Sequence, residues 1–352
     1  MALFLDAPVP LSDALTFTQS QPIPSNNALT QMFPSQTFDT DTIDWSVVKT
    51  TNRVLKYRNW DGAFAPVERD TYEEKRTKMI PLGGFLETGE WERRQIEHAA
   101  TGGTNIGRIV EAIYNDLEAL TRYAYNRVEL AWGDVLTDGI LTIEENGVSQ
   151  ALDFGVAGGQ KVTAGTLWSN ASTSTPLTNL LAWTDVYTAA NGAPQGKFLT
   201  SIEVIRLLMK NTELINAIKG DQTGATMVSL AEINSLLASY GLPGFETPGL
   251  GNVGGSVYNS SFEVDGATQR VIANNKLLFL PSDMSTLGFT AWGIPTTAYE
   301  LNPKTTQVNV APGMVGILVR EDNPPFRKHA YVDAVALPVL SDPRKLLIAT
   351  VA

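Results

Sequence analysis

The chain has 352 residues, enough for roughly two domains, with a net charge of −11 and no cysteine. The missing cysteine excludes disulfides, thiolate metal sites and a cysteine nucleophile, and the acidic balance argues against a dedicated nucleic-acid binder, because phosphate contacts need a clustered positive field. The start carries no basic residue and no apolar run reaches about 18 residues, so we expect neither a signal peptide nor a membrane-spanning helix.

The first 48 residues contain five Asp but no Lys, Arg or Glu, and they include a polar, Pro-spaced stretch at 18–27. A segment of this kind has little to pack on itself. It nevertheless carries apolar side chains that favour burial, namely Phe33, Phe38, Ile43 and Trp45. We therefore expect an arm that lies on other structure, either of its own chain or of a neighbour.

The composition then changes sharply. Between Lys49 and Lys78 lie eight basic and five acidic residues, and Asn59-Trp-Asp-Gly62 supplies a turn signal between two strand-like runs. The pattern predicts a long two-stranded loop with charged faces. Because an isolated hairpin is only marginally stable in water, this loop is also expected to need a partner surface.

A long helix is the clearest local prediction. Apolar residues recur from Ile106 to Val135 at steps of three and four that average 3.6, the α-helical period. Gly102-Gly103 and Thr104 precede the pattern, and Asp138-Gly139 follows it. We expect one helix over about 104–137 with a single buried stripe.

The remaining elements mix helices and strands. A strand, a turn and a second strand are predicted within 140–154, and Ser229 to Glu232 form a capping box that opens a helix. Further helices are expected at 177–190, at 201–209 and before Gly220, and strands at 197–200, 262–264, 276–280, 314–319, 331–337 and 346–351. The mixed order indicates an α+β fold.

The sequence contains no strong motif for a catalytic, nucleotide-binding or metal-binding site. Gly249 to Gly254 match the dinucleotide fingerprint G-x-G-x-x-G, but that motif needs a preceding strand and a following helix, and Pro243 and Pro248 precede it here. A surface loop is the favoured interpretation, and a nucleotide-binding enzyme stays an alternative. The carboxylate clusters lack the spacing of a calcium loop and are interpreted as solvated faces: Asp39, Asp41, Asp44, Glu73, Glu74, Glu144 and Glu145.

The two histidines, His98 and His329, have no nucleophile near them that suggests catalysis. His98 is interpreted as an ordinary residue before the long helix, with a pH-responsive residue as the alternative. His329 is expected at the start of a strand. We therefore assign no catalytic, cofactor-binding or metal-binding residue, expect no cofactor, and do not expect an enzyme.

Several ordered segments together resemble one protein family. They are 32–45, Ala63-Phe-Ala-Pro66, Lys75 to Leu82, the helical stretch 106–135 and the closing stretch Tyr331 to Ala352 with its Ser-Asp-Pro turn. In order and spacing they are similar to the lambda-type major capsid protein E family of tailed bacteriophages, which has the Hong Kong 97-type coat fold.

The resemblance implies both an architecture and a role. It implies an N-terminal arm (1–46), an extended loop (47–83), a peripheral domain (84–160) with a spine helix at about 104–137, an axial domain (161–310), and C-terminal strands (311–352) that return to the peripheral domain. It also implies a major capsid protein that assembles as hexamers and pentamers into an icosahedral shell enclosing double-stranded DNA, without sequence-specific binding. A nanocompartment shell protein derived from a prophage is the alternative with the same fold.

The implied partners are further copies of the chain, a portal and, in some particles, a decoration protein. No long, charged, helical segment stands at the N-terminus, so a separate scaffolding protein is expected. The implied location is the virion capsid, assembled in the bacterial host cytoplasm and without a membrane. Lys75 or Lys78 lies in the region where some relatives form a Lys–Asn cross-link, but the branch resembled here does not generally form one.

The charged loop suggests where subunits meet. We expect six basic side chains to pair with acidic patches on adjacent subunits and so to set register and partner choice: Arg53, Lys56, Arg58, Lys75, Arg76 and Lys78. The alternative is a solvated charged hairpin, since exposed ion pairs usually contribute little stability.

Overall fold

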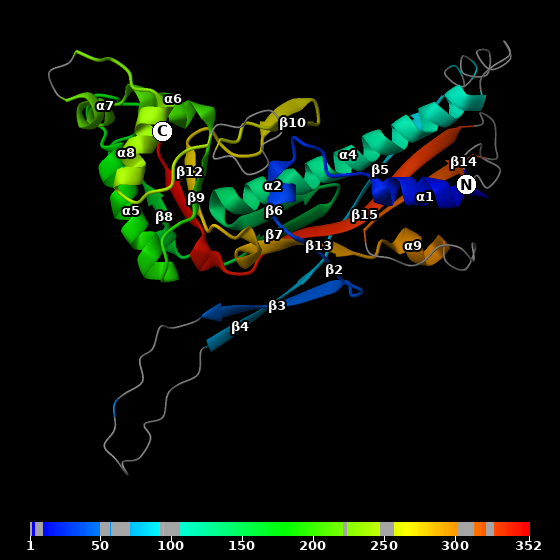
Figure 1. Cartoon of the computed structure of the whole chain (residues 1–352). Helices are drawn as coiled ribbons and strands as arrows, with labels where there is room; N and C mark the ends of the chain where they lie inside the picture. The colour runs from blue at the N-terminus through cyan, green and yellow to red at the C-terminus, as the bar shows by residue number, and fades with distance from the viewer. Residues whose placement is uncertain are drawn as a thin grey trace.

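A computed structural model of the chain describes residues 2–3, 10–49, 57, 71–89, 91, 94, 106–220, 224–246, 257–301, 313–321 and 327–352. Two bodies are visible, a helix laid along a large sheet and a smaller helix-rich lobe, and a two-stranded ladder projects from them (Figure 1). Each body has its own apolar core. The mixture of helices and sheets confirms the α+β class.

The predicted long helix is α4 (Ile106–Asp138), which has 33 residues and is therefore about 50 Å long. Its buried stripe contains Leu117, Leu120, Val128 and Val135, as the sequence period predicts. The helix lies along the long strand β15 (Lys328–Leu340) (Figure 1). In the described part of the chain, no helix is both long enough and apolar enough to cross a membrane.

β15 is the central strand of the first sheet. β5 (Pro81–Thr88) and β14 (Met314–Arg320) pair with the same stretch of β15 and therefore lie on opposite edges of it. The rest of β15 pairs with β13 (Gly288–Gly293). Two short strands complete this sheet, β1 (Ala2–Leu3) beside β14 and β2 (Ser35–Thr37) beside β13.

The described N-terminal residues lie against their own chain and bury some of their apolar side chains there. They form α1 (Leu11–Ser20) and α2 (Ala28–Met32), neither of which the sequence pattern predicts, because both are short. Phe33 and Ile43 belong to the main core, and the Phe33 ring stacks on Trp132 of α4 with ring centroids 3.6 Å apart. Phe38 packs against the same core, whereas the side chain of Trp45 lies outside the described residues.

The smaller lobe is built on a second sheet, in the order β8 (Lys161–Thr163), β16 (Leu347–Thr350), β12 (Lys276–Leu280) and β9 (Lys197–Thr200). The tail strands thus divide between the sheets, because β14 and β15 join the first and β16 joins the second. Large aromatic side chains fill the core of this lobe: Trp168, Tyr187, Phe198 and Phe279.

Four helices cover this second sheet: α5 (Pro176–Asn191), α6 (Ile202–Lys210), α7 (Thr212–Lys219) and α8 (Leu230–Ser239). The predicted N-terminal signals are confirmed. Ser201 accepts a hydrogen bond from the Val204 N–H, and Ser229 with Glu232 forms the complete capping box of α8. These caps explain why the boundaries of the helices were readable from the sequence.

Two hairpins and several short helices connect these larger elements in the described part of the chain. The predicted strand–turn–strand is β6 (Ile140–Glu145) and β7 (Val148–Asp153), joined by Asn146-Gly147 at positive φ. β10 (Ser261–Val264) pairs with β11 (Ala267–Arg270), and further short helices are α9 (Thr296–Leu301), η2 (Gly158–Gln160), η3 (Met284–Thr286) and η4 (Pro343–Lys345).

The second strand of the projecting ladder lies within the predicted two-stranded loop, whereas its first strand begins before the predicted range. β3 (Thr42–Lys49) pairs antiparallel with β4 (Thr71–Lys78) over eight residues of each strand. It leaves the body beside β2 and points away from both cores (Figure 1). The turn predicted at 59–62 lies outside the described residues.

Candidate assembly surfaces

Three of the six predicted interface residues can be placed, and all three lie on β4. Lys75, Arg76 and Lys78 alternate between the two faces of the strand, since successive side chains of a strand point to opposite sides. Arg76 and Lys78 therefore share one face, and Lys75 lies on the other. Arg53, Lys56 and Arg58 lie outside the described residues.

Lys75 faces its own chain. Its Nζ donates to the Asp153 carbonyl oxygen at the end of β7, at 3.1 Å. On the same face, Thr77 is buried and its hydroxyl accepts from Gln150 Nε2 at 3.4 Å. These contacts attach the base of the ladder to the β6–β7 hairpin. The structure thus gives Lys75 a role within the subunit, which the sequence pattern alone did not distinguish from the roles of its neighbours.

Arg76 and Lys78 face solvent. Arg76 Nε lies 3.2 Å from Asp44 Oδ1 directly across the ladder, and the two side chains are 71% and 67% exposed. An exposed ion pair of this kind adds little stability. Lys78 is also exposed. This face of the ladder is therefore charged and solvent-exposed, and its ion pair contributes little to the fold of the subunit.

A buried carboxylate, which the sequence analysis did not single out, joins three parts of the fold. Glu129 of α4 is fully buried, and its oxygens accept hydrogen bonds from the backbone N–H groups of Leu29 (2.8 Å) and Thr30 (2.7 Å) at the start of α2. The Thr30 hydroxyl donates at 2.6 Å and the Tyr258 hydroxyl at 2.5 Å. We call these four residues the Glu129 cluster.

The Glu129 cluster also reaches the second sheet. Tyr258 donates its backbone N–H to the Thr200 carbonyl of β9 at 2.8 Å, while its hydroxyl contacts Glu129. Burial raises the pKa of the Glu129 carboxyl, and the hydrogen bonds from Thr30, Tyr258 and Leu29 offset part of that effect. Burial, followed by the charge of Glu129, raises the pKa of the Tyr258 phenol. The cluster is therefore a structural junction, with every oxygen of Glu129 occupied by the protein itself.

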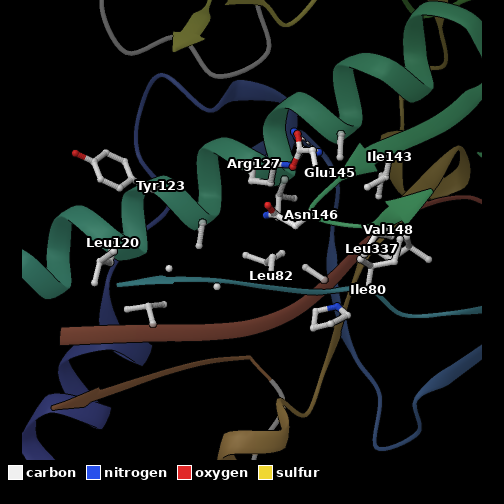
Figure 2. A pocket seen from close by; sticks show the side chains of 18 of the residues that line it. Ile80, Leu82, Leu120, Tyr123, Arg127, Ile143, Glu145, Asn146, Val148 and Leu337 are labelled. Atoms are coloured by element: carbon white, nitrogen blue, oxygen red, sulfur yellow. Dashed lines mark ion pairs between the residues drawn. The ribbon is translucent and has the colours of Figure 1, made fainter. Parts of the chain in front are cut away.

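A pocket of about 530 Å³ opens between α4, β5 and the β6–β7 hairpin (Figure 2). Its walls are mainly apolar and include Leu82, Leu120, Val128 and Ile143. Arg127 and Glu145 stand at one side of it and pair with each other at 3.1 Å. The charges in this pocket therefore neutralise each other, and nothing there requires a charged ligand.

The other candidate residues are placed without forming a site. Asp39, Asp41 and Asp44 are exposed, as expected, and Glu144 is exposed beside Glu145. Across the described ranges, no group of three or more potential metal ligands comes together. His98 and the glycine motif at 249–254 lie outside those ranges, as do the side chains of Glu73 and Glu74.

His329 is the second residue of β15, which confirms its expected place at a strand start. It is buried, with its Nε2 3.5 Å from Glu321 Oε1, and its ring lies near the rings of Phe85 and Tyr331. His329 is therefore part of the packing of the first sheet.

Comparison with known proteins identifies relatives over almost the whole chain. A family model described as phage major capsid protein E matches residues 15–351. No curated protein matches the sequence.

Solved structures share the fold at low identity. A prophage capsid protein from E. coli CFT073 is 15% identical with a TM-score of 0.61, covering 96% of this chain and 97% of its own. A phage-related protein from Bordetella bronchiseptica RB50 is 10% identical with a TM-score of 0.54, covering 96% and 94%. The capsid of a native GTA particle is 12% identical with a TM-score of 0.50, covering 94% and 92%.

Proposed function

The chain belongs to the phage major capsid protein E family, and from this premise we propose that its copies form hexamers and pentamers that close into an icosahedral shell around double-stranded DNA. The match over residues 15–351 carries the proposal. It makes the chain a major capsid protein, a structural and non-enzymatic component of a virion capsid that is assembled from repeated subunits. The fold is the expected Hong Kong 97-type fold.

The family match also favours this role over the alternatives. A nanocompartment shell subunit would have the same fold, so the fold alone does not separate the two, but the matched family is that of phage capsids. A nucleotide-binding enzyme would need the glycine motif at 249–254 to stand between a strand and a helix N-terminus. A capsid family gives no support to that interpretation.

The architecture can be divided along the lines expected from the sequence. We assign residues 1–46 to an arm, 47–83 to an extended loop, 84–160 to a peripheral domain and 161–310 to an axial domain, with 311–352 as closing strands. The two apolar cores support a division into two domains. The final strand β16 pairs with β12 and β8, so we propose that this last part of the closing segment belongs with the axial domain and the earlier part with the peripheral domain.

The charged ladder is proposed as one contact between subunits. Arg76 and Lys78 lie exposed on one face of a projecting element, and the chain as a whole is acidic, so acidic surfaces of adjacent copies are available as partners. Arg53, Lys56 and Arg58 are included in the proposal from sequence. Lys75 contributes by anchoring the base of the ladder to Asp153. A solvated ladder stays the alternative interpretation.

A double charge reversal tests the ladder. Arg76→Glu with Lys78→Glu is expected to lower the particle yield at least tenfold by electron microscopy and to leave the circular dichroism of the subunit unchanged. The matched control, Lys161→Glu with Arg206→Glu, changes the net charge equally at exposed positions of β8 and α6. A normal yield from the ladder variant would contradict the proposal, as would an equal loss from the control.

DNA is proposed to be enclosed without tight binding. A coat with a net charge of −11 per subunit repels phosphate mildly, which allows packaging and release. Titration of free subunits with double-stranded DNA at 50 to 200 mM salt is expected to show weak binding with a shallow salt slope. A steep slope would indicate many phosphate contacts and would overturn this part of the proposal.

The further partners follow from the same role. A separate scaffolding protein, a portal and, in some particles, a decoration protein are proposed, with assembly in the bacterial host cytoplasm. Electron microscopy of the chain expressed alone and together with the product of the neighbouring gene tests the scaffold. Closed particles of one size only in the co-expression would support it, and uniform closed particles from the chain alone would contradict it.

A further inference from the structure

Among the residues that the structure describes, β5 lies at an edge of the first sheet. In the described part of the chain it pairs only with β15. Ala336 donates its N–H to the Ile80 carbonyl at 3.4 Å, and in an antiparallel ladder such bonds recur at every second residue. The backbone groups of Leu82, Gly84 and Leu86 therefore face β15.

The alternate residues of β5 face the other way. The N–H and C=O groups of Gly83, Phe85 and Glu87 point away from β15, and no hydrogen bond to them is found among the described residues. The two adjacent glycines carry no side chain that shields this edge. Natural sheets usually block an exposed edge with proline, a bulge or charged side chains, because an open edge accepts further strands. Here Pro81 stands only at the start of the strand.

Apolar surface adjoins both faces of this edge. On the face toward α4, Leu82 and Leu86 border the pocket described above, and Val148, which is 42% exposed, lines it on the hairpin side (Figure 2). On the opposite face, the Phe85 ring packs against Tyr331 and is 55% exposed. On the α4 side, Tyr123 also lines the pocket and is 53% exposed. A strand placed beside β5 would cover apolar groups on both of its faces.

We propose that an extended segment of a second copy of this chain adds to the first sheet as a strand beside β5. The outward backbone groups of Gly83, Phe85 and Glu87 would hold the segment by hydrogen bonds, and alternate side chains of the segment would enter the pocket beneath α4. This is strand addition, in which the backbone supplies affinity and the pocket supplies specificity. The inference rests on the capsid function, because in a shell of repeated subunits the neighbour is another copy.

The chemistry of the pocket agrees with an uncharged occupant. Arg127 and Glu145 already pair with each other, so they leave no charge for a ligand to neutralise. The apolar walls instead favour aliphatic or aromatic side chains, which gain roughly 1.5–3 kcal/mol each when fully buried. Such a contact, repeated at every subunit of a closed shell, can be weak singly and strong in sum.

Site-resolved hydrogen exchange on free subunits and on assembled particles tests the proposal. The amides of Gly83, Phe85 and Glu87 are expected to exchange at least tenfold more slowly in particles, whereas those of Leu82, Gly84 and Leu86 are protected in both states. Because the chain has no cysteine, Val148→Cys supplies a single thiol. Its reaction with a maleimide is expected to slow at least tenfold in particles made from the chain alone.

The outcomes separate the possibilities. Equal exchange of the outward amides in subunits and particles would overturn the proposal, and so would protection in free subunits, which would mean that the chain covers its own edge. Protection that appears only when another protein is added would also overturn it. Phe85→Lys is expected to reduce particle formation while Phe85→Tyr retains it. If the unmodified chain forms no particles by electron microscopy, the proposed self-assembly is itself contradicted. If particles form but the outward amides of β5 stay unprotected, only the proposed strand addition is contradicted.

Discussion

The Tyr258 hydroxyl donates to Glu129 Oε1 at 2.5 Å, across 129 positions of sequence, and this contact connects the smaller lobe to the C-terminal third of the long helix. The same carboxylate accepts from Leu29 and Thr30, so the N-terminal segment, α4 and the β9 sheet meet at one buried charged group. A shell subunit must keep its parts in a fixed relation while its surfaces bind neighbours. The Glu129 cluster supplies that fixed relation inside the subunit.

Removal of the carboxylate is expected to be strongly destabilising. Glu129→Ala leaves the buried donors of Leu29, Thr30 and Tyr258 without an acceptor, and each such group costs about 1–3 kcal/mol. Tyr258→Phe removes a single donor and is expected to lower the free energy of unfolding by less than Glu129→Ala does. Denaturant unfolding of free subunits measures both. Glu118→Gln, at an exposed position of the same helix, is the control and should change stability by less than about 0.5 kcal/mol.

The raised pKa of Glu129 predicts how the stability of the subunit depends on pH. The folded subunit holds this proton more tightly than the unfolded chain does, so the proton stabilises the fold below the ordinary pKa of 4.5, and that contribution is lost as the pH rises through the raised pKa. The free energy of unfolding of the unmodified chain, minus that of Glu129→Gln, should therefore fall with rising pH in this window. A difference that increases with pH would show that the hydrogen bonds outweigh burial and lower the pKa.

The capping box of α8 predicts a pH dependence of stability with the opposite sign. Hydrogen bonds from Lys219 and Ser229 lower the pKa of the Glu232 carboxyl to about 2. The contribution of the ionised Glu232 carboxylate to the stability of the fold is therefore complete above the ordinary pKa of 4.5, and it is lost as the pH falls toward 2. NMR titration of the Glu232 carboxyl carbon checks the value. Lys219→Met and Ser229→Ala should each move it upward, and Ser229→Ala should also cost about 1 kcal/mol as a lost helix cap.

Gly133 of α4 is expected to tolerate no side chain. An added Cβ would lie 2.1 Å from the Val271 carbonyl oxygen and 2.5 Å from Val271 Cγ1, so the helix and the chain after β11 must separate to admit it. Gly133→Ala should destabilise the subunit by about 1–3 kcal/mol, although alanine normally favours a helix. Thermal unfolding measures the change. Asn115→Ala, exposed on the same helix, is the control, and a stabilised Gly133→Ala would contradict the packing described here.

Much of the fold could be predicted from local patterns in the sequence. The 3.6-residue period predicted α4 within about two residues of its observed ends, because one wide face of that helix is buried along most of its length. Ser201 and Ser229 marked helix starts for an equally local reason, since a capping side chain bonds to a backbone group three residues away. α1 and α2 were missed because they are too short to show a period and are stabilised by contacts with α4 and β14.

The candidate surfaces were less predictable. Sequence grouped Lys75 with Arg76 and Lys78 by charge, but the ladder turns Lys75 toward Asp153 and leaves the other two in solvent. The alternation of side chains along a strand predicts two faces, but it does not indicate which face packs against the rest of the protein. The sequence did not indicate that β5 lies at an edge, because this depends on which strands pair, and the residues of β15 that pair with β5 are 240 or more positions away.

By itself, then, the sequence determined the α+β class, the long helix, the helix caps, the absence of thiol chemistry and the capsid family, since each of these depends on composition or on residues close together in the chain. Only the tertiary structure decided that Glu129 is buried while Glu118 is exposed, although both are glutamates of the same helix. The reason is that the donors to Glu129 come from Leu29, Thr30 and Tyr258, about 100 or more residues away, and burial of a charge is favourable only where such distant partners converge.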